Sequence, residues 1–112
     1  MATANSVISD VKGGAFLIEE TAPAEVFTPE EFSEEQHAIA RTAAEFYSHE
    51  IEPNLGAIRH QEPGVAVRIL RKSGEIGLTG ILVPEKFGGM ELDLASALIA
   101  GEQLGRDGSY AG

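Results

Sequence analysis

Helix-start signals followed by regularly spaced apolar residues are the feature that most restricts the fold of this chain. The longest such pattern follows Ser33-Glu34-Glu35-Gln36, whose residue types are those of a capping box. Apolar residues then recur at steps of three and four, the period of an amphipathic helix, at Ile39, Ala43, Phe46, Tyr47 and Ile51. We expect this helix to end ahead of Pro53, because the residue before a proline is pushed out of helical geometry.

A second helix is predicted to open at Pro63-Gly64 and to end at Gly77, which suits a left-handed C-terminal cap. Its expected buried face carries Ala66, Ile69, Leu70 and Ser73. The apolar, β-branched residues 78–84 then predict an extended connector that lies against the core, and Gly88-Gly89 predicts a turn.

A third helix is predicted from the cap residue Asp93 through Gln103, with Gly105 beyond its end. One stripe of this helix carries Leu94, Ala97, Leu98, Gly101 and Leu104. Small residues at two positions of the stripe, Ala97 and Gly101, allow another helix to approach closely, although this spacing is also common by chance.

The residues ahead of these helices form a less regular N-terminal region. Residues 1–14 are small and polar and predict a loose arm, and the short apolar run Ala15-Phe-Leu-Ile18 is compatible with a strand-like latch. Thr28-Pro29-Glu30-Glu31 predicts a single helical turn. No strand pattern of convincing length appears. We therefore predict an all-α fold, a small antiparallel bundle of about three main helices plus a short N-terminal turn, with an extended N-terminal arm.

The charge of the chain is concentrated at one end. Its 112 residues carry a formal net charge of −10, and residues 1–62 hold most of that excess. Seven glutamates fall within residues 19–35 without one lysine or arginine. This acidic segment is either a solvated approach to a helix, with glutamates near the positive N-terminal end, or a docking surface for a basic partner. The acidic balance argues against nucleic-acid binding, which requires lysine and arginine against phosphates.

Composition also limits compartment and chemistry. The chain has no cysteine, which removes disulfides, thiolate chemistry and cysteine-ligated metals and fits a reducing compartment. Neither a secretory signal nor a transit peptide is visible at the start, and the longest uncharged stretch near the end is too short to span a bilayer. We expect a cytoplasmic protein without a transmembrane segment.

For each residue that could carry catalysis or bind a ligand, a structural role explains the sequence pattern better than a functional one. His37, His49 and His60 are expected to be exposed to solvent, and their spacing predicts no metal site. Ser109 lacks the glycine spacing of a nucleophile elbow and is expected to serve as a turn or a helix cap. Glu102 lies beside the apolar stripe of the third helix and is expected to be structural.

The glycine and basic clusters are equally unspecific. Gly74, Gly77 and Gly80 do not match a dinucleotide fingerprint or a phosphate loop, and we interpret them as a helix end and a tight connector. Arg68, Arg71 and Lys72 form a small basic patch, interpreted as a solvated face, with an interdomain salt-bridge surface as the alternative. We therefore predict no catalytic, cofactor-binding or metal-binding residue in this chain.

The order of these features resembles a known family. Four segments carry the resemblance: Phe27-Thr-Pro-Glu-Glu-Phe-Ser-Glu-Glu-Gln36, Leu70-Arg-Lys-Ser-Gly-Glu-Ile-Gly-Leu78, Gly80-Ile-Leu-Val-Pro-Glu-Lys-Phe-Gly-Gly89 and Glu102-Gln-Leu-Gly-Arg106. Together they resemble the N-terminal helical domain of the acyl-CoA dehydrogenases, FAD-dependent enzymes that oxidise acyl-CoA thioesters at the α,β carbons. The stretch Gly13-Gly-Ala-Phe-Leu-Ile-Glu-Glu20 further resembles the leader of the long-chain branch of that family.

The resemblance implies a domain organisation and a role. Residues 1–27 would be an arm and acidic leader, and residues 28–112 the N-terminal helical domain, incomplete at its C-terminal end. In the family the catalytic glutamate and most of the flavin site lie farther along the chain, so the resemblance implies FAD in the parent enzyme and none bound by this chain alone. It also implies acyl-CoA as substrate in fatty acid β-oxidation and an electron-transfer flavoprotein as electron acceptor. Its immediate partners would be the remaining dehydrogenase domains or a homo-oligomer.

Other interpretations stay open at this point. The chain is either a truncated or short form of this domain, one subunit of a split enzyme, or a non-enzymatic acidic helical module that docks a basic partner. An isolated domain of this kind would leave apolar stripes uncovered. We therefore expect it to associate, to be marginally stable or to bind a partner of its own.

Overall fold

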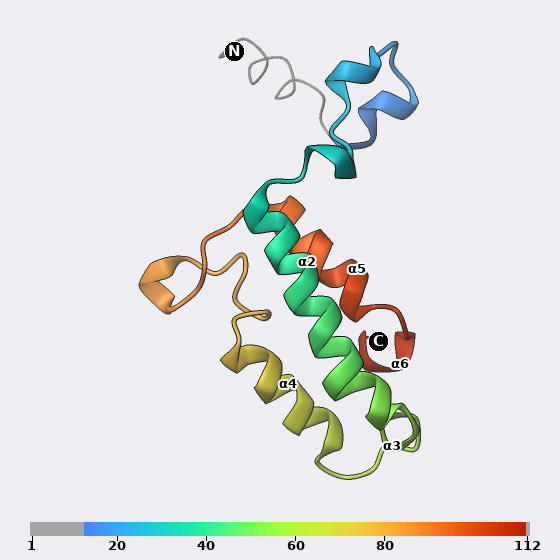
Figure 1. Cartoon of the computed structure of the whole chain (residues 1–112), viewed down its shortest axis with the longest axis vertical. Helices are drawn as coiled ribbons and strands as arrows, with labels where there is room; N and C mark the ends of the chain where they lie inside the picture. The colour runs from blue at the N-terminus through green and yellow to red at the C-terminus, as the bar shows by residue number, and fades with distance from the viewer. Residues whose placement is uncertain (1–12, 112) are drawn as a thin grey trace. The chain divides into compact units, whose positions relative to one another are not determined.

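The computed structural model describes residues 13–111, which are helical and contain no strand, as the predicted all-α class requires. The chain divides into two compact units, Met1–Ser33 and Glu34–Gly112. Figure 1 shows the α-helices of the second unit, which are α2 (Glu34–Phe46), α3 (Leu55–Arg59), α4 (Val65–Glu75), α5 (Leu94–Leu104) and α6 (Gly108–Ala111). The boundary predicted at residue 28 is not tested by this division.

The described part of the first unit consists of 3₁₀ turns, at Gly13–Leu17, Pro23–Glu25 and Pro29–Glu31. The last is the single turn predicted from sequence, and the backbone N–H of Thr28 donates to the Glu31 carboxylate at 2.9 Å. The apolar run that ends at Ile18 is not a strand, because the N–H of Ile18 donates locally to the Ala15 carbonyl at 3.0 Å. Residues 1–12 of the predicted arm lie outside the described residues.

Two acidic side chains of the first unit have structural roles. The Glu25 carboxylate accepts a hydrogen bond from the backbone N–H of Ala22 at 2.7 Å, and the Glu31 carboxylate has the equivalent bond from Thr28. A carboxylate that satisfies a free N–H at the start of a turn is stabilising there. These bonds support the interpretation of the acidic segment as a local structural feature.

The long helix begins at Glu34 as predicted, but Pro53 does not end the helical chain. After Phe46 the backbone widens into a π-helical segment, Tyr47–Ile51, then tightens into a 3₁₀ turn, Glu52–Asn54, and continues as α3. A proline inside an α-helix removes one hydrogen bond and clashes with the carbonyl four residues earlier. Changing the helical hydrogen-bonding pattern around Pro53 avoids this conflict, and the Asn54 side-chain amide donates to the Glu50 carbonyl at 2.7 Å. The proline rule therefore predicted a stop where the structure has a change of helix type.

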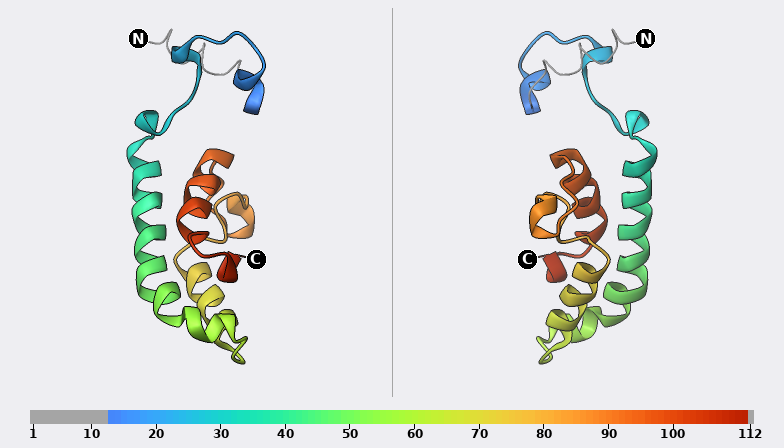
Figure 2. Two further views of the ribbon diagram at one scale, coloured as in Figure 1. Left: turned by 90° about the vertical axis from the view of Figure 1, so that its right-hand side faces the viewer. Right: turned by 90° about the vertical axis from the view of Figure 1, so that its left-hand side faces the viewer.

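The hydrophobic core of the second unit gathers around the end of α2. Its buried cluster consists of Phe46, Tyr47, Ile51, Ile58, Val65 and Ile69. Nearer the start of α2, Ile39 and Ala43 are buried where this helix lies alongside α5. Figures 1 and 2 both show this arrangement. All five predicted apolar positions of the first helical pattern are buried, which confirms that part of the prediction.

The ends of α4 and α5 follow the predicted capping chemistry. Gly77 has a left-handed φ of 89°, and its N–H donates to the Gly74 carbonyl at 3.1 Å while the N–H of Leu78 donates to the Ser73 carbonyl at 3.0 Å. These two bonds form a Schellman motif. At the start of α5 the Asp93 side chain accepts from the backbone N–H of Ser96 at 2.9 Å.

The predicted buried faces of α4 and α5 are partly wrong. On α4 the buried residues are Val65, Ile69 and Ser73, whereas Ala66 and Leu70 are exposed. On α5 the buried residues are Ser96, Ile99 and Ala100, while the predicted stripe is largely uncovered. Apolar residues occupy more than one face of both helices, so spacing alone does not identify the face that meets the core.

The connector between α4 and α5 is a closed loop and not an extended segment. A 3₁₀ turn, Glu85–Phe87, forms its tip. Backbone bonds join its two limbs, from the N–H of Met90 to the Gly80 carbonyl at 2.9 Å and from the N–H of Leu92 to the Ile81 carbonyl at 2.8 Å. Within residues 78–84 only Ile81 is buried, and Leu78 is partly buried against the core cluster, so the connector meets the core at these two residues and exposes most of the others.

The close approach inside this loop makes Gly89 sensitive to substitution. A Cβ added at Gly89 would overlap the carbonyl group and the Cβ of Val83. We expect Gly89→Ala to lower the free energy of unfolding by about 1–3 kcal/mol, because the loop must open to accept the methyl group. Urea unfolding followed by circular dichroism measures this change.

The matched control for that substitution is Gly56→Ala. Gly56 lies in α3, and a Cβ built on it meets nothing within 4 Å. Alanine there should raise the free energy of unfolding by up to about 1 kcal/mol through helix propensity. Equal effects of the two variants would contradict the close approach seen in the loop.

Candidate functional site

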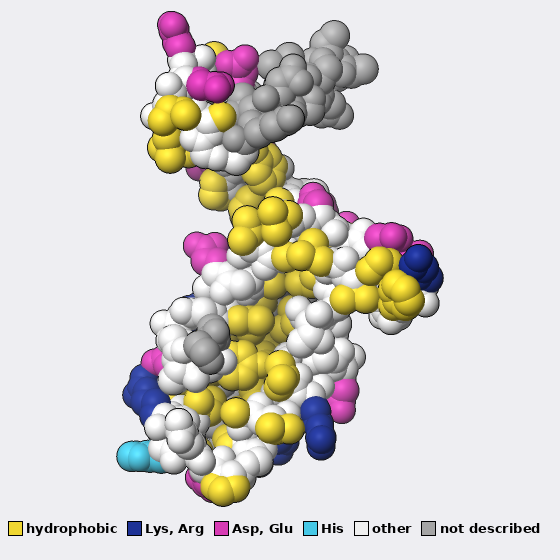
Figure 3. Space-filling view, turned by 180° about the vertical axis from the view of Figure 1, so that it is seen from behind, with side chains coloured by type: hydrophobic (Ala, Val, Ile, Leu, Met, Phe, Trp, Pro, Cys, Tyr) yellow, Lys and Arg dark blue, Asp and Glu magenta, His cyan; other side chains and the backbone are white. Residues whose placement is uncertain are grey.

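An apolar groove lies between α4, α5 and α6. It has a volume of about 430 Å³ and is lined by Ala66, Val67, Leu70, Ser73, Thr79, Gly101, Leu104 and Tyr110. In Figure 3 hydrophobic side chains gather along a hollow on the corresponding part of the surface. Five of these residues lie on the helix faces that the sequence predicted to be apolar, whereas Val67, Thr79 and Tyr110 were not singled out, because they belong to no recognisable motif.

A second hollow of about 210 Å³ continues this surface toward the connector. The two hollows share Thr79, Gly101 and Leu104, and the second adds apolar residues of the loop and of α5: Leu78, Ile81, Leu82, Val83, Ala97 and Ala100. Together they form a single apolar surface, which we call the α4–α5 groove.

The side of α5 away from the core is also apolar. Leu94 is 63% exposed and Leu98 is 64% exposed, whereas Ile99 and Ala100 on the other side are buried against the rest of the unit. A helix that is apolar on opposite faces is typical of the interior of a larger structure. The exposed apolar side of α5 therefore indicates a surface suited to packing against another apolar segment of protein.

The polar atoms of the groove are hydroxyls. Ser73 is buried, and its Oγ donates to the Leu70 carbonyl at 2.6 Å while the Tyr110 hydroxyl lies 3.5 Å from it. The Ser73 proton is thus engaged with a backbone carbonyl, and no charged side chain is among the residues that line the groove. This lining can pack against apolar groups, but it offers no acid, base or cation for chemistry.

The histidines singled out from sequence are not brought together. His37, His49 and His60 are all exposed, as predicted, and His49 Nδ1 lies 2.9 Å from the Glu45 carbonyl. Among residues 13–111, no group of three or more histidine, aspartate or glutamate side chains is placed to hold a metal ion. Glu102 is exposed as well, so it lacks the desolvation that a catalytic carboxylate needs.

The basic patch on α4 is partly used within the domain. Lys72 forms an ion pair with Glu50 at 2.9 Å, and Arg68 and Arg71 are exposed. Exposed pairs of this kind contribute little to stability. The patch is therefore mainly a solvated face, as predicted, with one contact that ties α4 to the end of the long helix.

The helix cap near the C-terminal end is Asp107 and not Ser109. The Asp107 carboxylate accepts hydrogen bonds from the backbone N–H of Ser109 at 2.9 Å and from its hydroxyl, and it also pairs with Arg59. The bonds from Ser109, followed by the Arg59 contact, lower the pKa of Asp107 to about 2. Ser109 itself lies in the single turn of α6, which is one of the two roles predicted for it, while the cap is Asp107.

This lowered pKa predicts a defined pH dependence. The charged form of Asp107 stabilises the fold fully above the ordinary aspartate pKa of 3.8, and that contribution is lost as the pH falls through about 2. Asp107→Asn should remove the component of the acid transition that this group causes. A carboxyl NMR titration measures the pKa directly, and a value near 3.8 in the folded chain would contradict these contacts.

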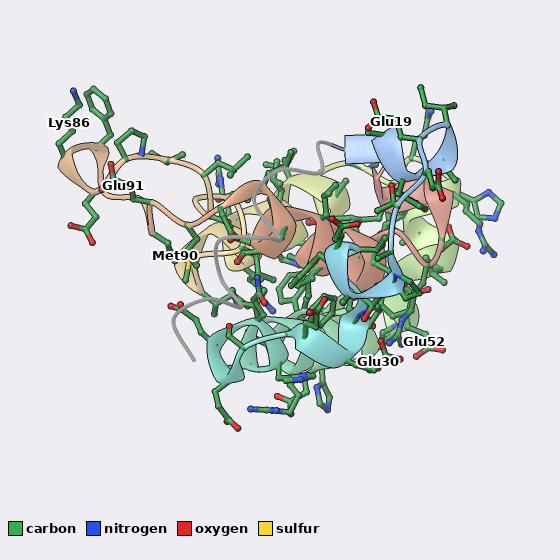
Figure 4. The ribbon with its side chains drawn as sticks, turned by 90° about the horizontal axis from the view of Figure 1, so that it is seen from above. Glu19, Glu30, Glu52, Lys86, Met90 and Glu91 are labelled. Atoms are coloured by element: carbon green, nitrogen blue, oxygen red, sulfur yellow. The ribbon has the colours of Figure 1, made fainter. Side chains whose placement is uncertain are left out.

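The tip of the connector loop presents an aromatic side chain to solvent. Phe87 is 72% exposed, and the Lys86 ammonium lies 5.0 Å from the centre of its ring. Figure 4 shows Lys86 at the tip, Glu91 on the returning limb and Met90 closer to the helices. The side chains at this tip lie apart from the lining of the α4–α5 groove.

Comparison with known proteins identifies the family. Residues 33–112 match the family described as "Acyl-CoA dehydrogenase, N-terminal domain". The chain belongs to the acyl-CoA dehydrogenase family. It is 38% identical over 100 residues to a probable acyl-CoA dehydrogenase of Bacillus subtilis (strain 168), covering 89% of this chain and 17% of that protein. The resemblance to the acyl-CoA dehydrogenase family that was predicted from sequence is thereby confirmed.

Two further comparisons agree with this family assignment. The probable acyl-CoA dehydrogenase YngJ of Bacillus subtilis (strain 168) is 32% identical over 76 residues, covering 68% of this chain and 20% of that protein. A solved acyl-CoA dehydrogenase complexed with FAD from Bacillus anthracis superposes with a TM-score of 0.77 at 43% identity, over 86% of this chain and 16% of that one. The chain therefore spans between about a sixth and a fifth of the length of the proteins that it resembles.

In the described part of the chain, the helices are short compared with a bilayer-spanning helix. Between residues 13 and 111, no helix combines the length and the apolar character needed to cross a bilayer. Its longest α-helix, α2, has 13 residues, whereas a spanning helix takes about 20.

Proposed function

We propose that this chain acts as the N-terminal helical domain of an FAD-dependent acyl-CoA dehydrogenase, residues 28–112, preceded by an arm and acidic leader at residues 1–27. The parent activity would be the α,β-dehydrogenation of a fatty acyl-CoA in β-oxidation, in the cytoplasm, with an electron-transfer flavoprotein as electron acceptor. The observation that carries the proposal is the α4–α5 groove in a member of this family, because it provides an apolar surface for the remaining domains.

The residues of this chain do not fit a complete flavin site. The lining of the groove contains hydroxyls and apolar side chains, without a cationic group for a diphosphate. The glycines at positions 74, 77 and 80 end α4 and shape the loop, and they do not form a phosphate-binding turn. We therefore assign no step of the reaction and no FAD contact to residues of this chain.

The contribution that we propose for the domain is exclusion of water. A reaction that passes through a charged, enolate-like state benefits from a site closed to solvent. The groove and the outer side of α5 present apolar groups, including Leu70, Leu94 and Leu98, and would close one side of the acyl-chain and flavin pocket when other domains cover them. The catalytic glutamate of the parent enzyme would come from those other domains.

Complementation tests this function. The partner is the 38%-identical Bacillus subtilis relative expressed without the region that this chain matches, which we call the remainder. Mixing the chain with the remainder and FAD should yield a complex that retains flavin through gel filtration and whose flavin absorption is bleached by a fatty acyl-CoA. The remainder alone is the control. Retention and bleaching that are unchanged by the chain would contradict the proposal.

A further inference from the structure

We infer that the ion pair between Arg59 and Asp107 acts as a salt-sensitive latch, which holds α6 in place and thereby fixes Tyr110 as one wall of the α4–α5 groove. This device lies within the chain and does not depend on which part of the dehydrogenase covers the groove. Three features carry it: the shortness of α6, the contacts of the Asp107 carboxylate and the connection of Arg59 to the core.

α6 is too short to hold its position by itself. It consists of the four residues Gly108–Ala111, and an isolated helix shorter than about 12 residues is marginal in water. Tyr110 is partly buried against the core cluster, and its hydroxyl lies 3.5 Å from Ser73 Oγ. This separation is longer than the range of about 2.5–3.0 Å usual for a hydrogen bond between two hydroxyls. The position of α6 therefore depends on the contacts made at its start.

The Asp107 carboxylate joins the start of α6 to the end of α3. One oxygen, Oδ1, accepts a hydrogen bond from the backbone N–H of Ser109 at 2.9 Å, and the other, Oδ2, accepts from the Arg59 guanidinium. Because both bonds use one planar group, the first turn of α6 takes its direction from the end of α3. These two helices lie next to each other in the lower part of the unit (Figure 1).

Arg59 is a fixed point for this connection because α3 is anchored in the core. Ile58, the residue before it, is buried in the core cluster. On the other side of the turn, the Arg106 guanidinium lies 5.4 Å from the centre of the Tyr47 ring, and Tyr47 belongs to the same cluster. The turn that leads into α6 is thus held to the core through two cationic side chains.

The latch is sensitive to salt because its cation faces solvent. The Arg59 side chain is 58% exposed, and that of Asp107 is 19% exposed. Charges in contact with solvent are screened, and the Debye length falls from about 8 Å at physiological ionic strength to about 3 Å at 1 M salt. When the pair separates, α6 keeps its Asp107 cap but loses its tie to α3. Tyr110 then leaves the groove more often, and the groove loses this wall.

Nitration of tyrosine by tetranitromethane tests this inference on the 112-residue chain. The chain has two tyrosines and no cysteine, the other side chain that this reagent attacks readily. Tyr110 reports on α6, and Tyr47, which is buried, reports on the core. Arg59→Gln and Asp107→Asn should each raise the nitration rate of Tyr110 by about two- to fivefold, the population change that an exposed ion pair supports. Asparagine is itself a good helix cap, so the second variant removes the charge and keeps the cap.

The double variant separates a latch from two unrelated effects. Arg59→Gln and Asp107→Asn break the same contact, so both together should give no larger increase than either alone. A direct electrostatic effect on the phenol would instead act in opposite directions, because one variant removes a positive charge and the other a negative charge. Sodium chloride at about 1 M should raise the Tyr110 rate of the unmodified chain to that of the variants and leave the variants unchanged.

The matched control is Lys72→Gln. Lys72 is exposed, forms its own ion pair with Glu50 at 2.9 Å and lies outside the lining of the groove. This variant also removes one cation and one ion pair, and the Tyr110 rate should stay at the value of the unmodified chain. The inference would be overturned by an equal increase with Lys72→Gln, an unchanged rate with Arg59→Gln, additive increases in the double variant, or a parallel rise at Tyr47.

Discussion

Ile69→Ala is expected to lower the free energy of unfolding by about 2–5 kcal/mol. Ile69 is fully buried at the centre of α4 and belongs to the cluster that joins this helix to the end of α2. Its replacement removes apolar contacts and leaves a cavity. Domains of this size have a total stability of about 5–15 kcal/mol, so the loss is a large fraction of what holds the fold.

The adjacent position provides the control. Leu70 is 54% exposed, and alanine is at least as good a helix former as leucine. Leu70→Ala should therefore change the free energy of unfolding by less than about 1 kcal/mol. Urea unfolding of both variants measures the difference, and a Leu70→Ala effect as large as that of Ile69→Ala would show that the groove face of α4 is buried in solution.

The second large effect concerns association of the chain in solution. The 112-residue chain should self-associate through the outer side of α5, because Leu94 and Leu98 expose most of their apolar surface. Burial of one leucine side chain contributes about 1.5–3 kcal/mol. The double variant Leu94→Gln/Leu98→Gln should therefore weaken association by at least about a hundredfold. Sedimentation velocity over a range of concentrations measures this change.

A double substitution in the other unit serves as the control for association. Leu17 and Ile18 are 75% and 88% exposed, and changing both to glutamine removes a similar apolar area. Association that depends on α5 should be unaffected by this control. A monodisperse, stable monomer at all concentrations would contradict the expected association.

Sequence pattern was sufficient for the helices whose two sides differ strongly. Along α2, charged residues such as Arg41 and Glu45 occupy the side opposite Ile39 and Ala43, so one face is clearly the buried one. α5 has no such contrast, and its most regular apolar stripe is largely exposed at Leu94 and Leu98 but packs against the core cluster at Leu104. Apolar residues on both sides of α5 are what the proposed burial of this helix against other domains would require.

The change of helix type around Pro53 was not predictable from local rules. Those rules state that a proline disfavours the α conformation before it, but they do not say whether the chain stops or switches to another helical form. The outcome depends on tertiary packing, because Ile51 before the proline and Ile58 after it both belong to the core cluster. Keeping both residues inward favours a continuous helical path.

The position of the groove was also not predictable from the sequence. It is formed by residues far apart in the chain, such as Val67, Thr79 and Tyr110, and none of them belongs to a chemical motif. The family resemblance, by contrast, was carried by contiguous segments and was confirmed by comparison. Sequence motifs therefore identified the family. The packing of the helices was needed to locate the uncovered apolar surface of this chain.

Side-chain footprinting of the chain with and without the remainder tests the central claim most directly. Hydroxyl-radical oxidation followed by mass spectrometry reports the solvent access of individual side chains. The account predicts that oxidation of Leu70 and Leu98 falls several-fold when the remainder is added, while oxidation of Leu17 stays the same. Unchanged oxidation of Leu70 and Leu98 in a complex that has formed would contradict the claim that this apolar face is covered by the rest of the dehydrogenase.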